Sequence, residues 1–222
     1  MDKIILKPSF SPSFIYLVWS LWVIITLTFF GKDAAAISGD NGFTDAATYF
    51  FYACALCCFL IFVQDFKKVG KLKDYCAFLT LTIVLLLREM GAQHWLTTTD
   101  TTAIKIRFFT NPNNPLSEKI VAALVIITVV AIIGYIVVKW AVPTIKGFFK
   151  LNPLSWSVAT LGTFGLVGKT IDRMHSKFFS KMGEQIESYT SLLEETLEAM
   201  IPLTATIILI QVHFFVKTLK NK

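Results

Sequence analysis

The sequence predicts an all-α integral membrane protein with about six transmembrane helices and both termini in the cytoplasm. Hydrophobic residues make up 55% of the chain and charged residues only 16%, whereas soluble domains carry about 25% charged residues. The apolar residues gather into stretches close to the roughly 20 residues that cross a hydrocarbon core as a helix. Many of the basic residues lie in short segments between these stretches, so we treat residues 1–222 as one polytopic domain.

Each apolar stretch must be helical, because unpaired backbone groups are costly in lipid. The predicted spans, in chain order, are residues 14–30, 46–63, 75–96, 120–138, 154–171 and 197–216. Ten of the 30 residues at positions 169–198 are charged. We expect this part of the chain to form an amphipathic, membrane-proximal helix that leads into the last span.

The distribution of lysines predicts the orientation. Four lysines lie between Lys67 and Lys73, and three more lie between Lys217 and Lys222. Short loops rich in Lys and Arg stay in the cytoplasm, which places the protein in a bacterial-type inner (plasma) membrane. The same distribution accounts for the net charge of +6 without a nucleic-acid partner. Membrane lipid is the expected partner, and a second copy of the chain or a subunit of a membrane complex remains open.

The end of the third stretch carries the most unusual charges. Arg88 and Glu89 lie inside an apolar run and are followed by Gly91, His94 and Trp95. Ionisable residues within the bilayer are expensive and mark functional sites by default, so Arg88 and Glu89 are candidate catalytic residues. As neighbours in sequence they should not face each other, and salt bridges to other helices are the alternative. His94 is a candidate metal ligand, and it would approach Glu89 if the helix loosens at Gly91 or if the site lies between helices.

Two further groups of candidate residues lie on the same predicted outer side. Asp172 and His175 are three residues apart, a spacing that lets both contact one metal ion from one helical face. Glu195 and Glu198 share a face at the start of the last span, and Pro202 cannot donate to the carbonyl of Glu198. We predict Asp172, His175 and Glu195 as metal ligands and Glu198 as a catalytic residue.

Basic residues near these candidates suggest an anion-binding rim. Lys105 and Arg107 alternate with apolar residues in the second outer segment, and Arg173 follows Asp172. Such a pattern suits contact with lipid headgroups. Simple anchoring at the membrane surface is the alternative.

Carboxylates together with imidazoles suit a divalent metal such as Zn, Mn or Fe. The leading hypothesis is therefore a metal-dependent membrane enzyme, a hydrolase among the candidates, that acts on a lipid or lipid-linked substrate from the periplasmic (outer) face. The alternatives are a haem or di-iron redox protein and a non-enzymatic accessory or structural subunit of a membrane complex. No HExxH, P-loop or G-x-S-x-G motif is present to decide between them.

Overall fold

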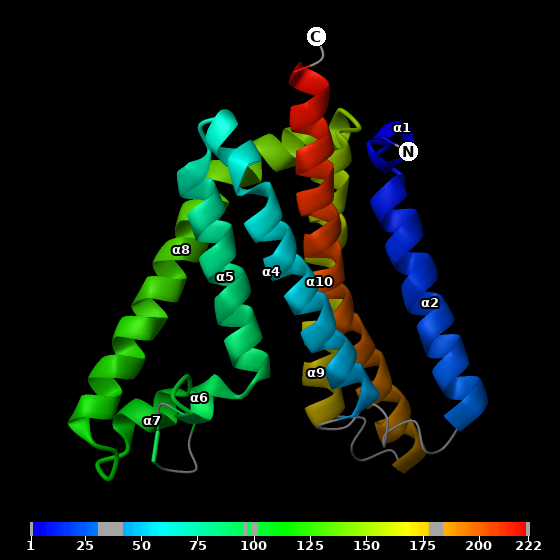
Figure 1. Cartoon of the computed structure of the whole chain (residues 1–222). Coiled ribbons are helices and arrows are strands. Elements are labelled where there is room, and N and C mark those ends of the chain that lie inside the picture. Colours follow the sequence, from blue (N-terminus) through cyan, green and yellow to red (C-terminus); the bar gives the residue numbers. More distant parts are fainter. Residues whose placement is uncertain (1, 31–41, 96, 99–101, 178–183, 221–222) are drawn as a thin grey trace. The chain divides into compact units, whose positions relative to one another are not determined.

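The computed structural model describes residues 2–30, 42–95, 97–98, 102–177 and 184–220. Within these ranges the chain forms helices, turns and loops, and no strand. The helices are α1 (Asp2–Ile5), α2 (Phe10–Phe30), α4 (Phe43–Lys68), α5 (Leu72–Glu89), α6 (Ala92–Trp95), α7 (Ile106–Thr110), α8 (Leu116–Phe149), α9 (Pro153–Lys177) and α10 (Glu184–Lys220), as labelled in Figure 1. The all-α class is confirmed.

Four of these helices contain a segment long and apolar enough to cross a membrane. The segments are Phe10–Phe30, Phe43–Lys68, Leu116–Phe149 and Ser188–Thr218. The other two predicted spans coincide with α5 and α9, which are not among these four. These helices identify the chain as a membrane protein. The number of six membrane spans and the cytoplasmic location of the termini stay predictions.

In three places the helices begin or end at other residues than the predicted spans. The third stretch is not one helix to residue 96, because α5 ends at Glu89 and Gly91 takes a left-handed φ of 76°. Residue 138 does not end the fourth helix, because α8 continues to Phe149 despite Pro143. The described residues of the charged segment 169–198 belong to two helices: residues 169–177 end α9, and residues 184–198 begin α10, which continues into the last span.

The chain divides into two compact units. Unit 1 comprises Met1–Gly70 and Pro143–Lys222, and unit 2 comprises Lys71–Val142. In unit 1, α10 packs against α9, α4 and α2, and α2 also packs against α9. Figure 1 shows α10, in orange to red, running beside α4.

The core of unit 1 lies where α2, α9 and α10 meet. Its buried residues are Ile15, Phe164, Leu197, Ala199, Met200 and Ile207. The rings of Tyr16 and Trp19 pack on Phe164 at centroid distances of 5.1 and 6.2 Å. Aromatic contacts at these distances add to the stabilisation from apolar burial. They fix the rotation of α2 against α9.

A buried polar network joins the same three helices closer to the chain termini. Ser11, Ser157 and Gln211 are each 0% exposed. Ser11 Oγ lies 2.6 Å from Ser157 Oγ, Ser157 Oγ donates to Gln211 Oε1 at 2.5 Å, and Gln211 Nε2 donates to Ser11 Oγ at 3.2 Å and to the carbonyl of Ile5 at 2.8 Å. With Ser11 donating to Ser157, the three side chains close a ring. A fully satisfied network of this kind specifies one packing arrangement.

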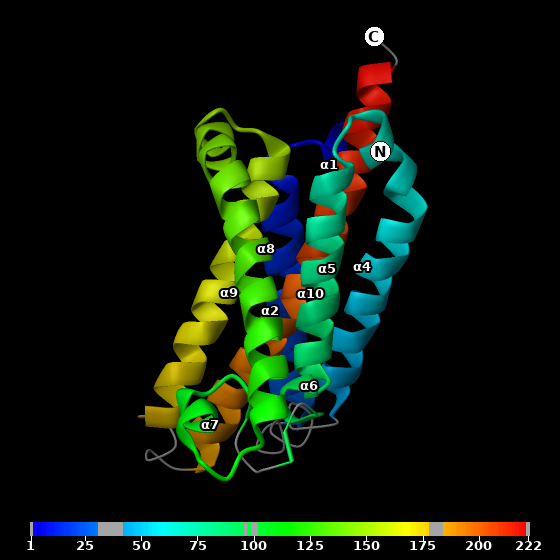
Figure 2. The same cartoon turned by 90° about the vertical axis from the view of Figure 1, so that its left-hand side faces the viewer.

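Unit 2 is organised differently. Helix α5 and the portion of α8 that belongs to unit 2 lie closest to each other near the first residues of α5, as Figure 1 shows. There the rings of Phe78 and Trp140 lie 6.4 Å apart, and Lys71 Nζ lies 5.3 Å from the centre of the Trp140 ring. Towards the start of α8, a small cluster of Ala103, Phe108 and Ala122 is buried. Figure 2 shows α7 beside this start of α8.

Candidate functional site

The largest group of predicted site residues lies along α9 and α10 and includes Asp172, Arg173, Glu195 and Glu198. Together with the neighbouring Lys169 of α9 and Glu194 of α10, these four residues are called the hairpin-end cluster below. All of them belong to unit 1.

Helices α9 and α10 are antiparallel, and their contacts determine how far along the pair each residue of the hairpin-end cluster lies. Ser157 contacts Gln211 near one end of the pair, and a Cβ at Gly168 would lie 3.6 Å from Leu197 Cβ further along. With a rise of about 1.5 Å per residue, Asp172 lies about 6 Å beyond Gly168, at the level of Leu193. Asp172 and Glu194 therefore lie within about one helical turn of each other along the axis.

The carboxylates of α10 stand in apolar surroundings. Glu194, Glu195 and Glu198 are half-buried. Their neighbours Thr196, Ala199 and Met200 are each 0% exposed. Moving a carboxylate out of water is costly unless it is paired or wetted. The helix continues through Pro202, which leaves the carbonyl of Glu198 without its usual backbone donor.

The α9 side of the cluster supplies charges of both signs. Lys169 forms an ion pair with Asp172 one turn along the helix. Asp172 is half-buried, and Arg173 is exposed. The backbone of His175 lies in the last turns of α9, and its side chain lies outside the described part of the structure.

The remaining predicted residues belong to unit 2. Arg88 and Glu89 form the last residues of α5, and their side chains approach to 3.9 Å. The expectation that these neighbours cannot face each other is wrong, because the helix ends here and the long side chains turn towards each other. His94 lies on α6, beyond the break at Gly91, and is exposed.

The predicted residues thus fall into two sets. Arg88, Glu89 and His94 lie in unit 2, and Asp172, His175, Glu195 and Glu198 lie in unit 1. Their convergence on one centre stays a prediction. Among the residues that the structure describes, no three His, Cys, Asp or Glu side chains gather closely enough to hold a metal ion.

The predicted rim residues Lys105 and Arg107 lie in unit 2, like Arg88. Lys105 precedes α7, Arg107 lies within it, and both side chains are exposed. Arg173, the third predicted rim residue, is in unit 1.

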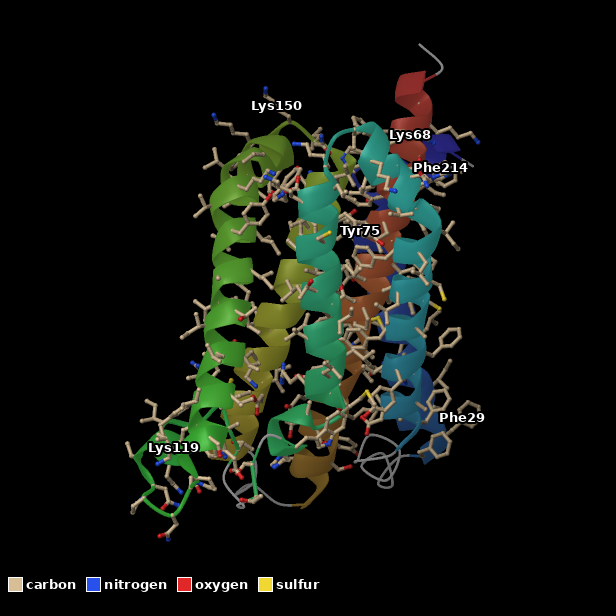
Figure 3. The ribbon with its side chains drawn as sticks, turned by 60° about the vertical axis from the view of Figure 1, so that its left-hand side comes forward. Phe29, Lys68, Tyr75, Lys119, Lys150 and Phe214 are labelled. Atoms are coloured by element: carbon tan, nitrogen blue, oxygen red, sulfur yellow. The ribbon has the colours of Figure 1, made fainter. Side chains whose placement is uncertain are left out.

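His213, which is not among the predicted site residues, pairs with Asp65. His213 Nδ1 lies 2.7 Å from Asp65 Oδ2, and the Phe62 ring stacks on the imidazole at 4.6 Å. The pair joins α4 to α10 near the ends where Figure 3 labels Lys68 and Phe214. The predicted topology contained the signal, because it places the end of the second span and the end of the last span on one side of the membrane.

The sequence also gave no indication of a second interhelical pair, in unit 2. Asp74 Oδ1 accepts hydrogen bonds from Lys139 Nζ at 2.6 Å and Tyr135 Oη at 2.7 Å. The Asp74 side chain is only 1% exposed. Burial alone would raise the pKa of Asp74, which precedes the apolar part of α5, but the hydrogen bonds from Lys139 and Tyr135 outweigh burial and lower that pKa. Asp74 therefore stays ionised and ties α5 to α8.

No family model matches the sequence, and no curated protein and no solved structure matches it.

Proposed function

We propose that this chain is an integral membrane enzyme that uses the hairpin-end cluster to act on a lipid or lipid-linked substrate, with a bound divalent metal. One observation carries the proposal: Glu194, Glu195 and Glu198 are half-buried on α10, beside residues that are fully buried, on the helix that contains a candidate membrane span. Charged groups in such surroundings are functional candidates by default. The proposal also places the site at the periplasmic face of a bacterial inner membrane. The distribution of lysines supports this part of the proposal.

The chemistry of the donors suits a divalent metal. Asp172 and Glu195 offer carboxylate oxygens, and His175 of the same unit is the proposed imidazole ligand. A bound divalent metal would lower the pKa of a coordinated water. Glu198 would accept the proton of the attacking water as general base.

Arg173 has a separate role in the proposal. It would hold the negatively charged part of the substrate, since a guanidinium group donates to phosphate oxygens. It would orient the substrate without taking part in proton transfer.

Metal content tests the proposal directly. Elemental analysis of the purified full-length protein should find bound Zn, Mn or Fe, and Asp172→Asn and Glu195→Gln should each reduce the metal content. Lys146→Met provides a matched control, because Lys146 is exposed and lies outside the cluster. A metal-free wild-type protein would contradict the proposal. An absorption spectrum of the same sample tests the alternative of a redox protein, because haem would give a Soret band.

A second candidate function is an accessory subunit whose charges only join helices. The described ion pairs favour it: Lys169 pairs with Asp172, His213 with Asp65, and Lys139 with Asp74. On this alternative, Glu195→Gln and Glu198→Gln would lower thermal stability and leave metal content unchanged.

A further inference from the structure

The connection between α6 and α8 carries a surface that the proposed chemistry does not use. Residues 102–116, called the interfacial segment below, include Ile104, Ile106 and Leu116, which are 61%, 82% and 73% exposed. Lys105 and Arg107 alternate with the isoleucines and are also exposed. Trp95, just before this segment, is 64% exposed. Large apolar side chains at such exposure indicate an interaction surface.

The interfacial segment is held in a defined shape. Phe108 is 0% exposed and packs with Ala103 and with Ala122 of α8. Asn114 Nδ2 donates to the carbonyl of Phe108 at 2.7 Å. Lys119 Nζ, labelled at this end of α8 in Figure 3, donates to the carbonyl of Asn111 at 2.7 Å. These contacts tie the segment to the start of α8. They therefore hold the backbone that carries the exposed isoleucines in one position relative to α8.

The exposed apolar surface of the interfacial segment continues along α8, and this continuity indicates what covers the segment. Leu116 is the first residue of a candidate span. Further along α8, Ile120, Leu124 and Ile127 follow it at helical spacing and are 52%, 60% and 64% exposed. These four residues form one apolar stripe. A membrane that surrounds α8 would therefore end at the level of the segment.

The charge pattern selects the bilayer surface over a protein partner. Lys and Arg beside Ile and Trp match the boundary between headgroups and acyl chains, where apolar side chains enter the membrane and basic groups meet phosphate. We propose that the interfacial segment inserts Ile104 and Ile106 into the bilayer surface and binds anionic phospholipid headgroups with Lys105 and Arg107. This proposal depends on membrane insertion of α8 and not on any catalytic role.

Site-directed fluorescence quenching tests the insertion. In a full-length protein with Cys54, Cys57, Cys58 and Cys76 replaced by alanine, a bimane probe is attached at Ile106→Cys or, as a control, at Asn113→Cys, an exposed residue of the same connection. Each protein is placed in nanodiscs that contain phosphatidylglycerol brominated near the headgroup end of its acyl chains. The probe at position 106 should lose fluorescence, and the probe at 113 should keep most of it. Equal quenching at both positions, or no quenching at either, would overturn the proposal. Protection of the probe at position 106 from brominated lipid by a second copy of the chain would overturn it as well.

The headgroup preference has its own readout. Lipid that remains bound to the detergent-purified protein should be enriched in phosphatidylglycerol over phosphatidylcholine. Each of Lys105→Gln and Arg107→Gln should reduce that enrichment by about fivefold, the effect of one basic residue near an anionic surface. Unchanged enrichment in the double variant would overturn the headgroup assignment. Neither readout requires enzymatic activity or bound metal, so failure here is distinguishable from failure of the proposed function.

Discussion

The two units of this protein are stabilised in different ways. Unit 1 surrounds α10 with three helices and has an apolar core and a closed ring of hydrogen bonds from Ser11, Ser157 and Gln211. In unit 2, α5 and α8 meet where the exposed Lys139 pairs with the buried Asp74, and a small cluster around Phe108 supports the other end of α8. Packing that is spread over many residues tolerates single changes better than one ion pair does. The difference predicts where substitutions will be most harmful.

Lys139→Met should cause the largest loss. It leaves the carboxylate of Asp74, which is 1% exposed, with Tyr135 as its remaining hydrogen-bond donor among the described residues. The loss should be large because a buried carboxylate is then left without the cation that compensates its charge. Unfolding in mixed micelles measures this loss. The double variant Lys139→Met with Asp74→Leu should regain most of it, and a single variant as stable as Lys146→Met would refute the role of the pair.

Gln211→Leu should have the next largest effect, on unit 1. The change removes the amide that accepts from Ser157 and donates to Ser11 and to the carbonyl of Ile5. Loss of a buried hydrogen-bond partner costs about 1–3 kcal/mol. Replacing all three ring residues by Ala, Ala and Leu should be milder than the single change, and the same unfolding measurement would show it. A single variant with wild-type stability would show that the ring does not hold the helices.

Gly168→Leu tests the close approach of α9 and α10. A Cβ at position 168 already reaches contact distance of Leu197, so a larger side chain must push the helices apart. Overpacking of this kind costs about 1–3 kcal/mol. Gly162→Leu on the same helix is the control, because a Cβ there meets nothing within 4 Å. Equal thermal stability of the two variants would contradict the register on which the hairpin-end cluster rests.

Lys169→Gln should have the smallest effect. Its ion pair with Asp172 lies on one helix, and the Lys169 side chain is 53% exposed. Such pairs contribute about 0.5 kcal/mol or less. A change in melting temperature as large as that of Lys139→Met would show that Lys169 has a partner beyond Asp172.

Much of the fold was predictable, and much of the site was not. The apolar stretches predicted the positions of all the long helices, because apolar composition and backbone pairing in lipid leave few alternatives. The end of α5 before Gly91 could not be predicted, because a glycine inside a helix and a glycine after a helix look alike in sequence. The pairs of Asp65 with His213 and of Asp74 with Lys139 depend on the order and rotation of helices. Neither is encoded in spacing along one helix.

The central claim is that the carboxylates of the hairpin-end cluster bind a divalent metal. The most direct test is the melting temperature of the chelator-treated protein, measured with and without added Mn²⁺ or Zn²⁺. At about one hundred times Kd, binding to the folded state stabilises it by about 2.7 kcal/mol. We predict that one of these ions raises the melting temperature of the wild type and not that of Glu195→Gln. If neither ion shifts the wild type, or both proteins respond equally, the claim is contradicted.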